Sequence, residues 1–243
     1  MAGSLREARL SSSLALIRGL KARLHSAADP LKAPAMRAYM KSEMPYLGIP
    51  APKLRALAKA VFAAHPLASA EQWRDTVLRI WRGARHREER YAGISLAGYQ
   101  KYAAFRDLDA IPMYEEMITS GAWWDYVDSI ASQHLGAMLR RYPRQMRSLL
   151  LRWSRDADMW KRRSAILAQL SFREETDLTL LYRCLEPSLR SSEFFLRKAI
   201  GWALRQYAWT DPDEVRRYVL EHESELSPLS RREALKNIAH HAD

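Results

Sequence analysis

The sequence is poor in cysteine, contains little glycine and has no long apolar run. Cys184 is the only cysteine among 243 residues, which excludes an intrachain disulfide and a thiolate metal cluster. We expect Cys184 to be a small, buried core residue. No segment approaches the roughly 20 apolar residues that span a bilayer, and the N-terminal stretch lacks the apolar core of a signal peptide. These absences predict a soluble, cytoplasmic protein.

Several enzyme classes lack their sequence signatures here. The chain contains no Gly-x-Gly-x-x-Gly, no P-loop and no Gly-x-Ser-x-Gly, which argues against nucleotide hydrolysis and serine hydrolase chemistry. The ligand pattern of zinc deaminases is also missing. The seven histidines are scattered, and His240 with His241 falls in a terminal tail, where a solvated end is the expected state. We therefore expect neither a metal nor a cofactor.

Acidic residues are outnumbered by basic ones. The chain has 39 Lys and Arg against 28 Asp and Glu, which gives a formal net charge of +11. Such a balance is typical of proteins that bind nucleic acid or another anionic surface. Composition alone does not separate these two kinds of partner.

Helix is the only regular structure that the sequence favours. Only 9 glycines occur, alternating apolar runs are missing, and apolar residues recur at spacings of three and four. Residues 14–24, 54–62 and 73–81 are predicted to form amphipathic helices, and residues 27–33 the first loop. Prolines separate the expected elements at positions 45, 50, 66, 112, 143, 187, 212 and 228. The predicted fold class is all-α.

A weak internal repeat, Arg-x-Ala, indicates how the helices are organised. It occurs at Arg90/Ala92, Arg163/Ala165, Arg197/Ala199 and Arg232/Ala234, with alanine spacings of 73 (165−92), 34 (199−165) and 35 (234−199). If the first gap holds two units, the period is about 36 residues, in the range of α-solenoids with a curved, concave surface. We find no linker and expect a single domain over residues 1–243. In the last unit, Ser230 and Glu233 are expected to form a capping box.

Two tryptophans and two carboxylates stand together at residues 123–128. On a helix Trp124 and Asp128 lie on one face, so an aromatic ring would stand beside an acid. Aromatics, an arginine and this acid form a candidate set distributed over several repeats: Tyr39, Trp124, Asp128, Arg163, Phe194, Phe195 and Trp202. The alternatives are ordinary: aromatic residues on helices usually pack in a core, and Arg163 would only cap or pair. Asp125 is most simply a helix N-terminal acid.

Longer motifs resemble those of the AlkD family of bacterial DNA alkylation repair glycosylases. They run in order along nearly the whole chain: Arg37-Ala38-Tyr39-Met40-Lys41 with Leu47-Gly48-Ile49, Gly121-Ala122-Trp123-Trp124-Asp125-Tyr126-Val127-Asp128-Ser129-Ile130, Trp160-Lys161-Arg162-Arg163-Ser164-Ala165-Ile166-Leu167, Glu193-Phe194-Phe195-Leu196-Arg197-Lys198-Ala199-Ile200-Gly201-Trp202 and Pro228-Leu229-Ser230-Arg231-Arg232-Glu233-Ala234.

The resemblance implies a solenoid of HEAT-like repeats that holds duplex DNA on a concave, basic face. It implies excision of cationic N3- and N7-alkylated purines without base flipping, which leaves bulky adducts among the candidate substrates. Asp128 would be the catalytic carboxylate, Trp124 and Trp202 would pack against the deoxyribose, and Arg163 would hold the adjacent backbone. Tyr39 matches an aromatic position near the DNA. We expect a monomeric, monofunctional enzyme of base excision repair without an obligate protein partner.

The residue types suit this chemistry. An alkylated purine cation leaves as a neutral base, so positive charge develops on the sugar, where one carboxylate stabilises it and positions a water. Phosphate contacts are expected from basic residues that are otherwise solvated surface charges: Arg141, Arg144, Arg147, Lys161 and Arg162.

Two alternatives to a glycosylase remain. One is a catalytically silent DNA-binding solenoid. The other is a protein-binding scaffold, which does not explain the net charge of +11.

Overall fold

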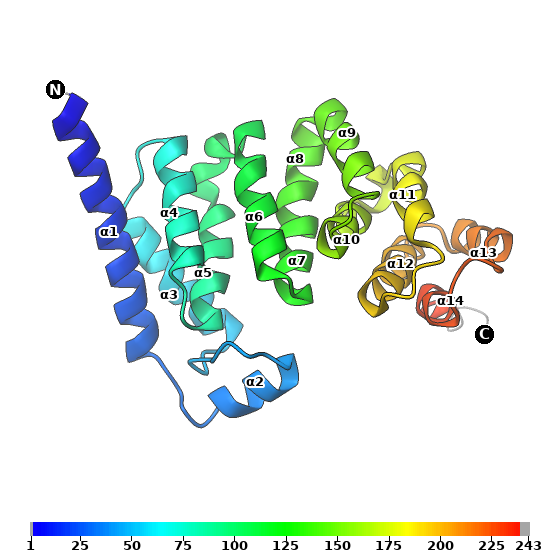
Figure 1. The fold of residues 1–243 in the computed structure, drawn as a ribbon, viewed down its shortest axis with the longest axis horizontal. Coiled ribbons are helices and arrows are strands. Elements are labelled where there is room, and N and C mark those ends of the chain that lie inside the picture. The colour runs from blue at the N-terminus through cyan, green and yellow to red at the C-terminus, as the bar shows by residue number, and fades with distance from the viewer. Residues whose placement is uncertain (1, 239–243) are drawn as a thin grey trace. The chain divides into compact units, whose positions relative to one another are not determined.

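Every regular element of the protein is a helix over the residues that the structure describes. The structure is a computed structural model that describes residues 2–238, and no β-strand occurs among them (Figure 1). The predicted all-α class is confirmed. The chain divides into two compact units, one up to Met113 and one from Tyr114 onward. The expectation of a single domain over residues 1–243 stays a prediction, and the units are described separately below.

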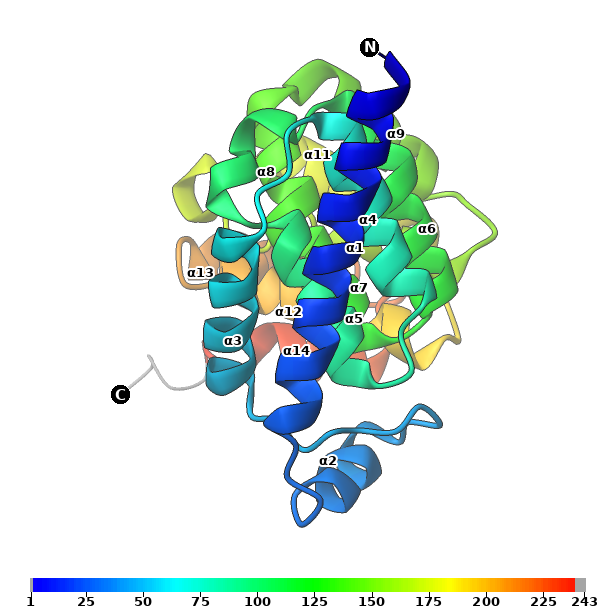
Figure 2. The ribbon, with the colours of Figure 1, turned by 90° about the vertical axis from the view of Figure 1, so that its left-hand side faces the viewer.

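The first unit is built from five α-helices and two short 3₁₀ turns. Their bounds are α1 Ala2–Ser26, α2 Ala33–Met40, α3 Ala51–Ala64, α4 Ala70–Arg82, α5 Arg87–Ala97, η1 Gln100–Phe105 and η2 Leu108–Ala110. The unit boundary falls inside α6, Ile111–Gly121. Helix α1 packs against α3, α4 and α5 (Figure 2). The helices predicted at 14–24, 54–62 and 73–81 are confirmed as parts of α1, α3 and α4.

Helix α4 illustrates why these segments fold as they do. Ser69 caps its first turn by accepting a hydrogen bond from the backbone N–H of Gln72. Trp73, Val77 and Ile80 are all at most 1% exposed, and their spacing of four and then three residues places them on one helix face. The Trp73 indole N–H donates to the carbonyl of Leu96 at 3.1 Å, so even the polar atom of this buried ring has a partner.

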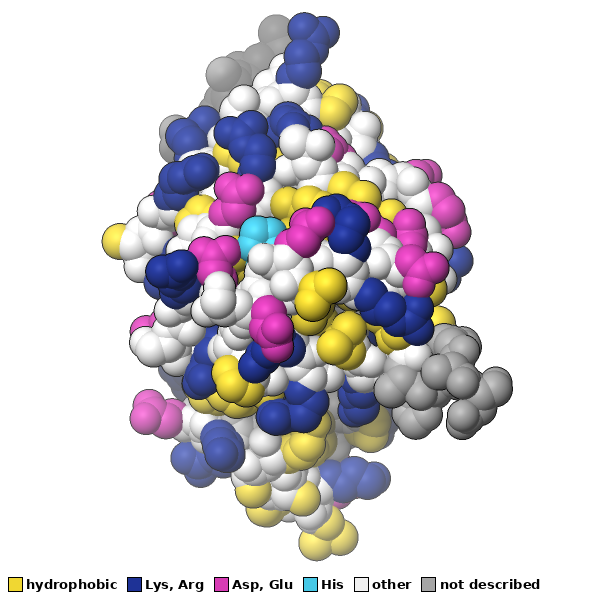
Figure 3. Space-filling view, turned by 90° about the vertical axis from the view of Figure 1, so that its right-hand side faces the viewer, with side chains coloured by type: hydrophobic (Ala, Val, Ile, Leu, Met, Phe, Trp, Pro, Cys, Tyr) yellow, Lys and Arg dark blue, Asp and Glu magenta, His cyan; other side chains and the backbone are white. Residues whose placement is uncertain are grey.

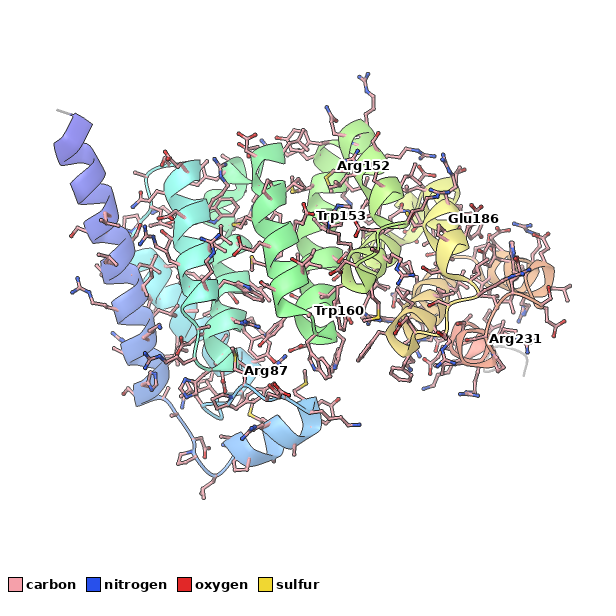
Figure 4. The ribbon with its side chains drawn as sticks, in the orientation of Figure 1. Arg87, Arg152, Trp153, Trp160, Glu186 and Arg231 are labelled. Carbon is pink, nitrogen blue, oxygen red and sulfur yellow. The ribbon has the colours of Figure 1, made fainter. Side chains whose placement is uncertain are left out.

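A buried carboxylate fixes the extended segment between α2 and α3. Glu88, in the first turn of α5, is fully buried and accepts hydrogen bonds from the backbone N–H groups of Leu47, Gly48 and Ile49 at 2.9, 2.9 and 3.1 Å. Its neighbour Arg87, which Figure 4 labels, is also buried and donates its backbone N–H to the Pro45 carbonyl at 3.0 Å. Helix α5 therefore anchors the segment that follows α2.

Gly48 is the one position of this segment that requires glycine. Its φ is +83°, and a Cβ there would lie 2.0 Å from the carbonyl oxygen of Asp29. Glycine alone combines that backbone conformation with so close an approach.

The second unit continues from α6 with eight further α-helices, a π-helical turn and two 3₁₀ turns. Their bounds are α7 Trp124–Ser129, η3 Ile130–Leu135, α8 Gly136–Arg141, α9 Pro143–Trp153, α10 Met159–Leu167, η4 Arg173–Glu175, α11 Leu178–Leu185, η5 Glu186–Ser188, α12 Phe194–Tyr207, α13 Pro212–Glu221 and α14 Pro228–Leu235. The prolines at 143, 212 and 228 each begin a helix, as their fixed φ favours.

The predicted repeat corresponds to helices that pack on one another. Ala165, Ala199 and Ala234 lie in α10, α12 and α14, and each is buried. Contacts join α10 to α12 and α12 to α14. The small side chain lets neighbouring backbones approach closely. At Gly201 the backbones of α12 and α14 are so close that a Cβ would lie 2.8 Å from the carbonyl oxygen of Ser230.

The capping box predicted for the last helix is wrong in its register. Ser227, not Ser230, caps α14 by accepting a hydrogen bond from the Ser230 backbone N–H at 3.0 Å. Ser230 is fully buried, and its hydroxyl donates to the Arg197 carbonyl. Glu233 does not reach back to a cap but pairs with Lys198 and Arg205, both at 2.8 Å. Contacts with α12 therefore take the place of the predicted capping box, because both Ser230 and Glu233 bind residues of that helix.

We predict that Glu88→Ala destabilises the protein by about 3 kcal/mol or more, because three buried N–H groups lose their acceptor and each such loss costs about 1–3 kcal/mol. Glu88→Gln retains one oxygen and is expected to cost less. Urea unfolding of the full chain measures both. The matched control is Glu71→Ala, an exposed acid in the first turn of α4, which is expected to change stability by less than about 1 kcal/mol. Equal losses for Glu88→Ala and Glu71→Ala would contradict the anchoring role.

Candidate active site

A buried ion pair lies at the centre of the second unit. Asp128, on α7, is 8% exposed, and Arg163, on α10, is 4% exposed. The guanidinium donates to both carboxylate oxygens, from Nε to Oδ1 at 2.7 Å and from Nη2 to Oδ2 at 2.8 Å. This two-point geometry fixes the carboxylate plane as well as its position. The predicted acid is thus held rigidly by the predicted arginine.

A third helix completes the arrangement. The remaining Nη1 of Arg163 donates to the backbone carbonyl of Phe195, in the first turn of α12. The Phe195 ring lies among aromatic neighbours, with centroid distances of 5.0 Å to Trp160, 5.6 Å to Trp123 and 5.4 Å to Phe194. Trp160, labelled in Figure 4, lies in the first turn of α10. One guanidinium therefore joins α7, α10 and α12 at the site.

The repeat explains why Asp128 is buried. Asp128 follows Ala92 by 36 residues (128−92) and precedes Ala165 by 37 (165−128), so it stands where the other repeats carry a buried alanine. A carboxylate at a helix-packing position loses its hydration and requires a compensating cation. Arg163 supplies that cation. An acid at this register is costly for folding unless it is paired.

The backbone is irregular on both sides of Asp128. Ala122 has a φ of +42°, a conformation that non-glycine residues seldom adopt, and it precedes the extended Trp123 that begins α7. The π-helical turn η3 begins at Ile130, and the Ser132 hydroxyl donates to the Asp128 carbonyl at 2.6 Å. Such insertions in a helix are frequent at functional sites. They rotate the residues that follow relative to an uninterrupted α-helix.

Burial and pairing act on Asp128 in opposite directions. Loss of hydration raises the pKa of the Asp128 carboxyl, and the nearby Asp125 charge raises it further, whereas the hydrogen bonds and charge of Arg163 lower it. Burial is the larger effect, so the pKa lies above its ordinary value. Arg163 therefore limits the rise and favours the ionised form.

The two tryptophans predicted at the sugar differ in their surroundings. Trp124 precedes Asp128 by one helical turn in α7 and is half-buried. Trp202, on α12, is also half-buried and packs against the core of the second unit. Trp202 follows Phe195 by seven residues, which puts both on one face of α12.

The four residues predicted to contact DNA differ in exposure and in their ion-pair partners. Tyr39, on α2 of the first unit, is 79% exposed. Lys161 is paired with Glu115 at 2.5 Å and Asp156 at 3.2 Å, so it would have to release these acids to bind a phosphate. Arg162 is half-buried, and its Nε has no hydrogen-bond partner within residues 2–238. Arg163 is committed to Asp128 and Phe195, and its contact with the DNA backbone stays a prediction.

The arginines at the end of α8 and in α9 lie far from Asp128. Arg140 follows Asp128 by twelve residues along continuous helix, a rise of about 18 Å. Arg140 pairs with Glu175 at 2.7 Å, and Arg147 pairs with Asp177. Arg141 lies 5.2 Å over the Tyr142 ring, and Arg144 is exposed. Arg147 forms a partly exposed ion pair, and its contact with a phosphate stays a prediction.

Three features of the site could not be read from the sequence. The Phe195 carbonyl binds Arg163 through the backbone, which no residue type reveals. Glu115 reaches Lys161 from α6, 46 positions earlier in the chain (161−115). Arg197 carries a buried Nε without a partner in the described part of the chain, as Arg162 does, although the sequence marked it only as a repeat position.

Charge on the molecular surface is mixed on the face drawn in Figure 3. Dark-blue basic and magenta acidic side chains both occur across it (Figure 3). The last helices also carry ion pairs, including Arg216 with Asp213 at 2.5 Å and Arg231 with Glu223 at 2.6 Å. Basic residues held in such pairs are weaker candidates for phosphate contacts.

These features define an all-helical protein with a buried carboxylate held by arginine between helical repeats. A family model described as DNA alkylation repair enzyme matches residues 20–238, and the chain belongs to this family. A solved structure of a predicted DNA alkylation repair enzyme from Enterococcus faecalis is similar, with 29% sequence identity and a TM-score of 0.73. The match covers 87% of this chain and 97% of that one. A search of curated proteins finds no match.

Membership of this family confirms the resemblance inferred from the motifs and assigns the protein a role in the repair of alkylated DNA. Among the helices of residues 2–238, none combines the length and apolar character that a membrane crossing requires. Cys184 is buried, as predicted, and burial raises the pKa of its thiol to about 12, which keeps it protonated and unreactive.

We predict that Arg163→Ala destabilises the protein by about 3–5 kcal/mol, because it leaves a buried carboxylate without its cation. Urea unfolding measures the loss. Arg152→Ala, which removes an exposed arginine of α9, is the matched control and is expected to change stability by less than about 0.5 kcal/mol. If both variants unfold at the same urea concentration, the ion pair does not hold the three helices together.

Proposed function

We propose that the protein is a DNA glycosylase that hydrolyses the N-glycosidic bond of cationic N3- and N7-alkylated purines in duplex DNA. The observation that carries the proposal is the buried Asp128 carboxylate, oriented at two points by Arg163 beside the half-buried Trp124. Family membership supplies the broader role in alkylation repair. The proposal includes a monomeric, monofunctional hydrolase of the bacterial cytoplasm that acts without base flipping.

The pairing suits an electrostatic role for Asp128. As the neutral base departs, positive charge grows on the deoxyribose, and a nearby ionised carboxylate stabilises it. A carboxylate has about four lone-pair positions, and Arg163 uses two of them, which leaves acceptors for a water or the sugar. Arg163 acts as a positioning residue, because it holds the carboxylate and favours its ionised form.

The tryptophans would surround the sugar. Trp124 and Trp202 are both half-buried, so each ring is anchored and still has accessible surface. An aromatic face against a developing cation contributes about 0.5–2 kcal/mol. The rings would also exclude bulk water, which strengthens the attraction between the sugar cation and Asp128.

DNA binding would rest on several weak contacts. The net charge of +11 favours a polyanion, and the exposed Tyr39 is an available stacking group. Arg162 is half-buried with a buried Nε, so it would have to turn its guanidinium outward to reach a phosphate. Lys161 would join them by exchanging Glu115 or Asp156 for a phosphate. The silent DNA-binding alternative uses the same contacts and differs only at Asp128.

We predict that Asp128→Asn binds duplex DNA normally and releases 7-methylguanine at least 100-fold more slowly, because the amide carries no charge. Single-turnover excision at saturating protein measures the rate. Asp125→Asn changes a second acid of α7 and serves as the matched control, with a rate near that of the wild type.

Loss of fold is distinguished from loss of chemistry by urea unfolding of Asp128→Asn beside the double variant Asp128→Asn/Arg163→Gln. The double variant removes both buried charges, so it is expected to be more stable than Asp128→Asn without regaining activity. An Asp128→Asn rate equal to wild type would refute the catalytic assignment. Tight binding without excision by the wild type, for 7-methylguanine and for a bulky cationic adduct, would favour the silent DNA-binding protein.

A pH dependence follows from the raised pKa of Asp128. Because the ionised form is the active one, the rate is expected to fall as pH drops through this pKa. Arg163 lowers the pKa, so Arg163→Lys, which keeps a charge but loses the two-point contact, is expected to move the acid limb to higher pH. Single-turnover rates between pH 4.5 and 8 test this shift. An acid limb at the same pH in both proteins would separate Asp128 from the pH-dependent step.

A further inference from the structure

Two histidines and a glutamate from distant parts of the sequence meet within the first unit. His25 lies in the last turn of α1, His86 directly precedes α5, and Glu89 lies in the first turn of α5. One potential ligand atom from each lies within 4.8 Å of the others. The two histidines are 61 positions apart (86−25), which is why they look scattered in the sequence.

The Glu89 carboxylate is oriented so that one oxygen faces both imidazoles. Its side chain is 2% exposed, and Oε2 accepts the backbone N–H of Arg85 at 3.2 Å and lies 3.3 Å from the Lys21 ammonium. Oε1 lies 3.4 Å from His86 Nδ1 and 3.8 Å from His25 Nε2.

The contact between His86 Nδ1 and Glu89 Oε1 is a long hydrogen bond of 3.4 Å, and its length also fits two ligands around a common centre. An imidazole N–H that donates to a carboxylate usually approaches to about 2.7–3.2 Å, and both contacts are longer. A tetrahedral ion with ligands at about 2.0–2.1 Å holds neighbouring ligand atoms about 3.4 Å apart. His86 and Glu89 already have that separation. His25 Nε2 lies 0.4 Å farther from Glu89 Oε1 than this separation, and the three ligand atoms all lie within 4.8 Å of one another, so His25, which is exposed at the end of α1, would have to move inward to complete the site.

We propose that His25, His86 and Glu89 bind one divalent transition-metal ion of the Zn²⁺ type, with water in the fourth position. Two imidazoles and a carboxylate form a common zinc ligand set. The ion would join the end of α1 to the start of α5, next to the Glu88 anchor. Its effect is structural and distinct from the chemistry at Asp128. The nearby Lys21 ammonium opposes a second cation and limits the affinity.

Zinc titration of the full, untagged chain tests the proposal. Imidazoles at positions 240 and 241, outside the described residues, would bind zinc independently, so all proteins carry His240→Gln and His241→Gln. Calorimetry at pH 7.5 is expected to give one ion per chain. His25→Gln, at an exposed position, is expected to weaken binding at least tenfold, and His86→Gln likewise.

The matched control is His222→Gln. His222 also faces a glutamate, Glu225 at 2.9 Å, and the only three-ligand group within residues 10–238 is that of His25, His86 and Glu89. Binding by His222→Gln is therefore expected to equal that of the unchanged chain. Zinc is also expected to raise the unfolding temperature of the unchanged chain and not that of His25→Gln.

Either of two results would overturn the site. One is no stoichiometric uptake at 100 µM zinc, and the other is equal affinity for the unchanged chain, His25→Gln and His86→Gln. Cobalt substitution gives an independent readout, because tetrahedral coordination produces a characteristic visible absorption that His25→Gln would lack. None of these measurements involves DNA, so their failure would leave the proposed glycosylase activity untouched.

Discussion

The second unit depends on the contact between Arg163 and Asp128. The arginine has five N–H donors in a rigid plane, and it directs them to the carboxylate of α7 and to the Phe195 carbonyl of α12. Each partner alone would be a buried polar group without compensation. Together they convert an acid that opposes folding into a fixed charge, which is the property that electrostatic catalysis requires.

The position of that acid within the repeat connects architecture and chemistry. A repeat protein buries small residues where its helices approach, and Ala165 and Ala199 serve this purpose in neighbouring units. Asp128 at the same register places a charge between helices. The left-handed Ala122 and the π-helical turn at Ile130 flank this position in the chain. The proposed catalytic acid therefore occupies a position that packs a small side chain in the neighbouring repeats.

Periodicity and charge made the helices, the repeat and the residue set at Asp128 predictable. The partners that side chains find on other helices were not predictable. Ser230 has the sequence of a cap, but Ser227 takes that role because Ser230 is buried against α12. Lys161 has the sequence of a phosphate ligand, but it pairs with Glu115 from a helix that the motif does not contain. Sequence spacing describes neighbours along one helix, whereas these partners are brought together only by packing.

Arg163 combines the structural pairing that the sequence offered as one interpretation with a positioning role that the sequence did not reveal. It is a structural pair, because removing it leaves Asp128 uncompensated, and it positions the proposed catalytic acid, because it sets the orientation and ionisation of that carboxylate. A residue of this kind affects stability and pH dependence together, whereas a phosphate contact affects mainly DNA affinity. Measuring the free energy of unfolding, the pH of the acid limb and the DNA affinity on the same variant therefore separates the two roles. Loss of a positioning residue changes the first two quantities, whereas loss of a phosphate contact changes mainly the third.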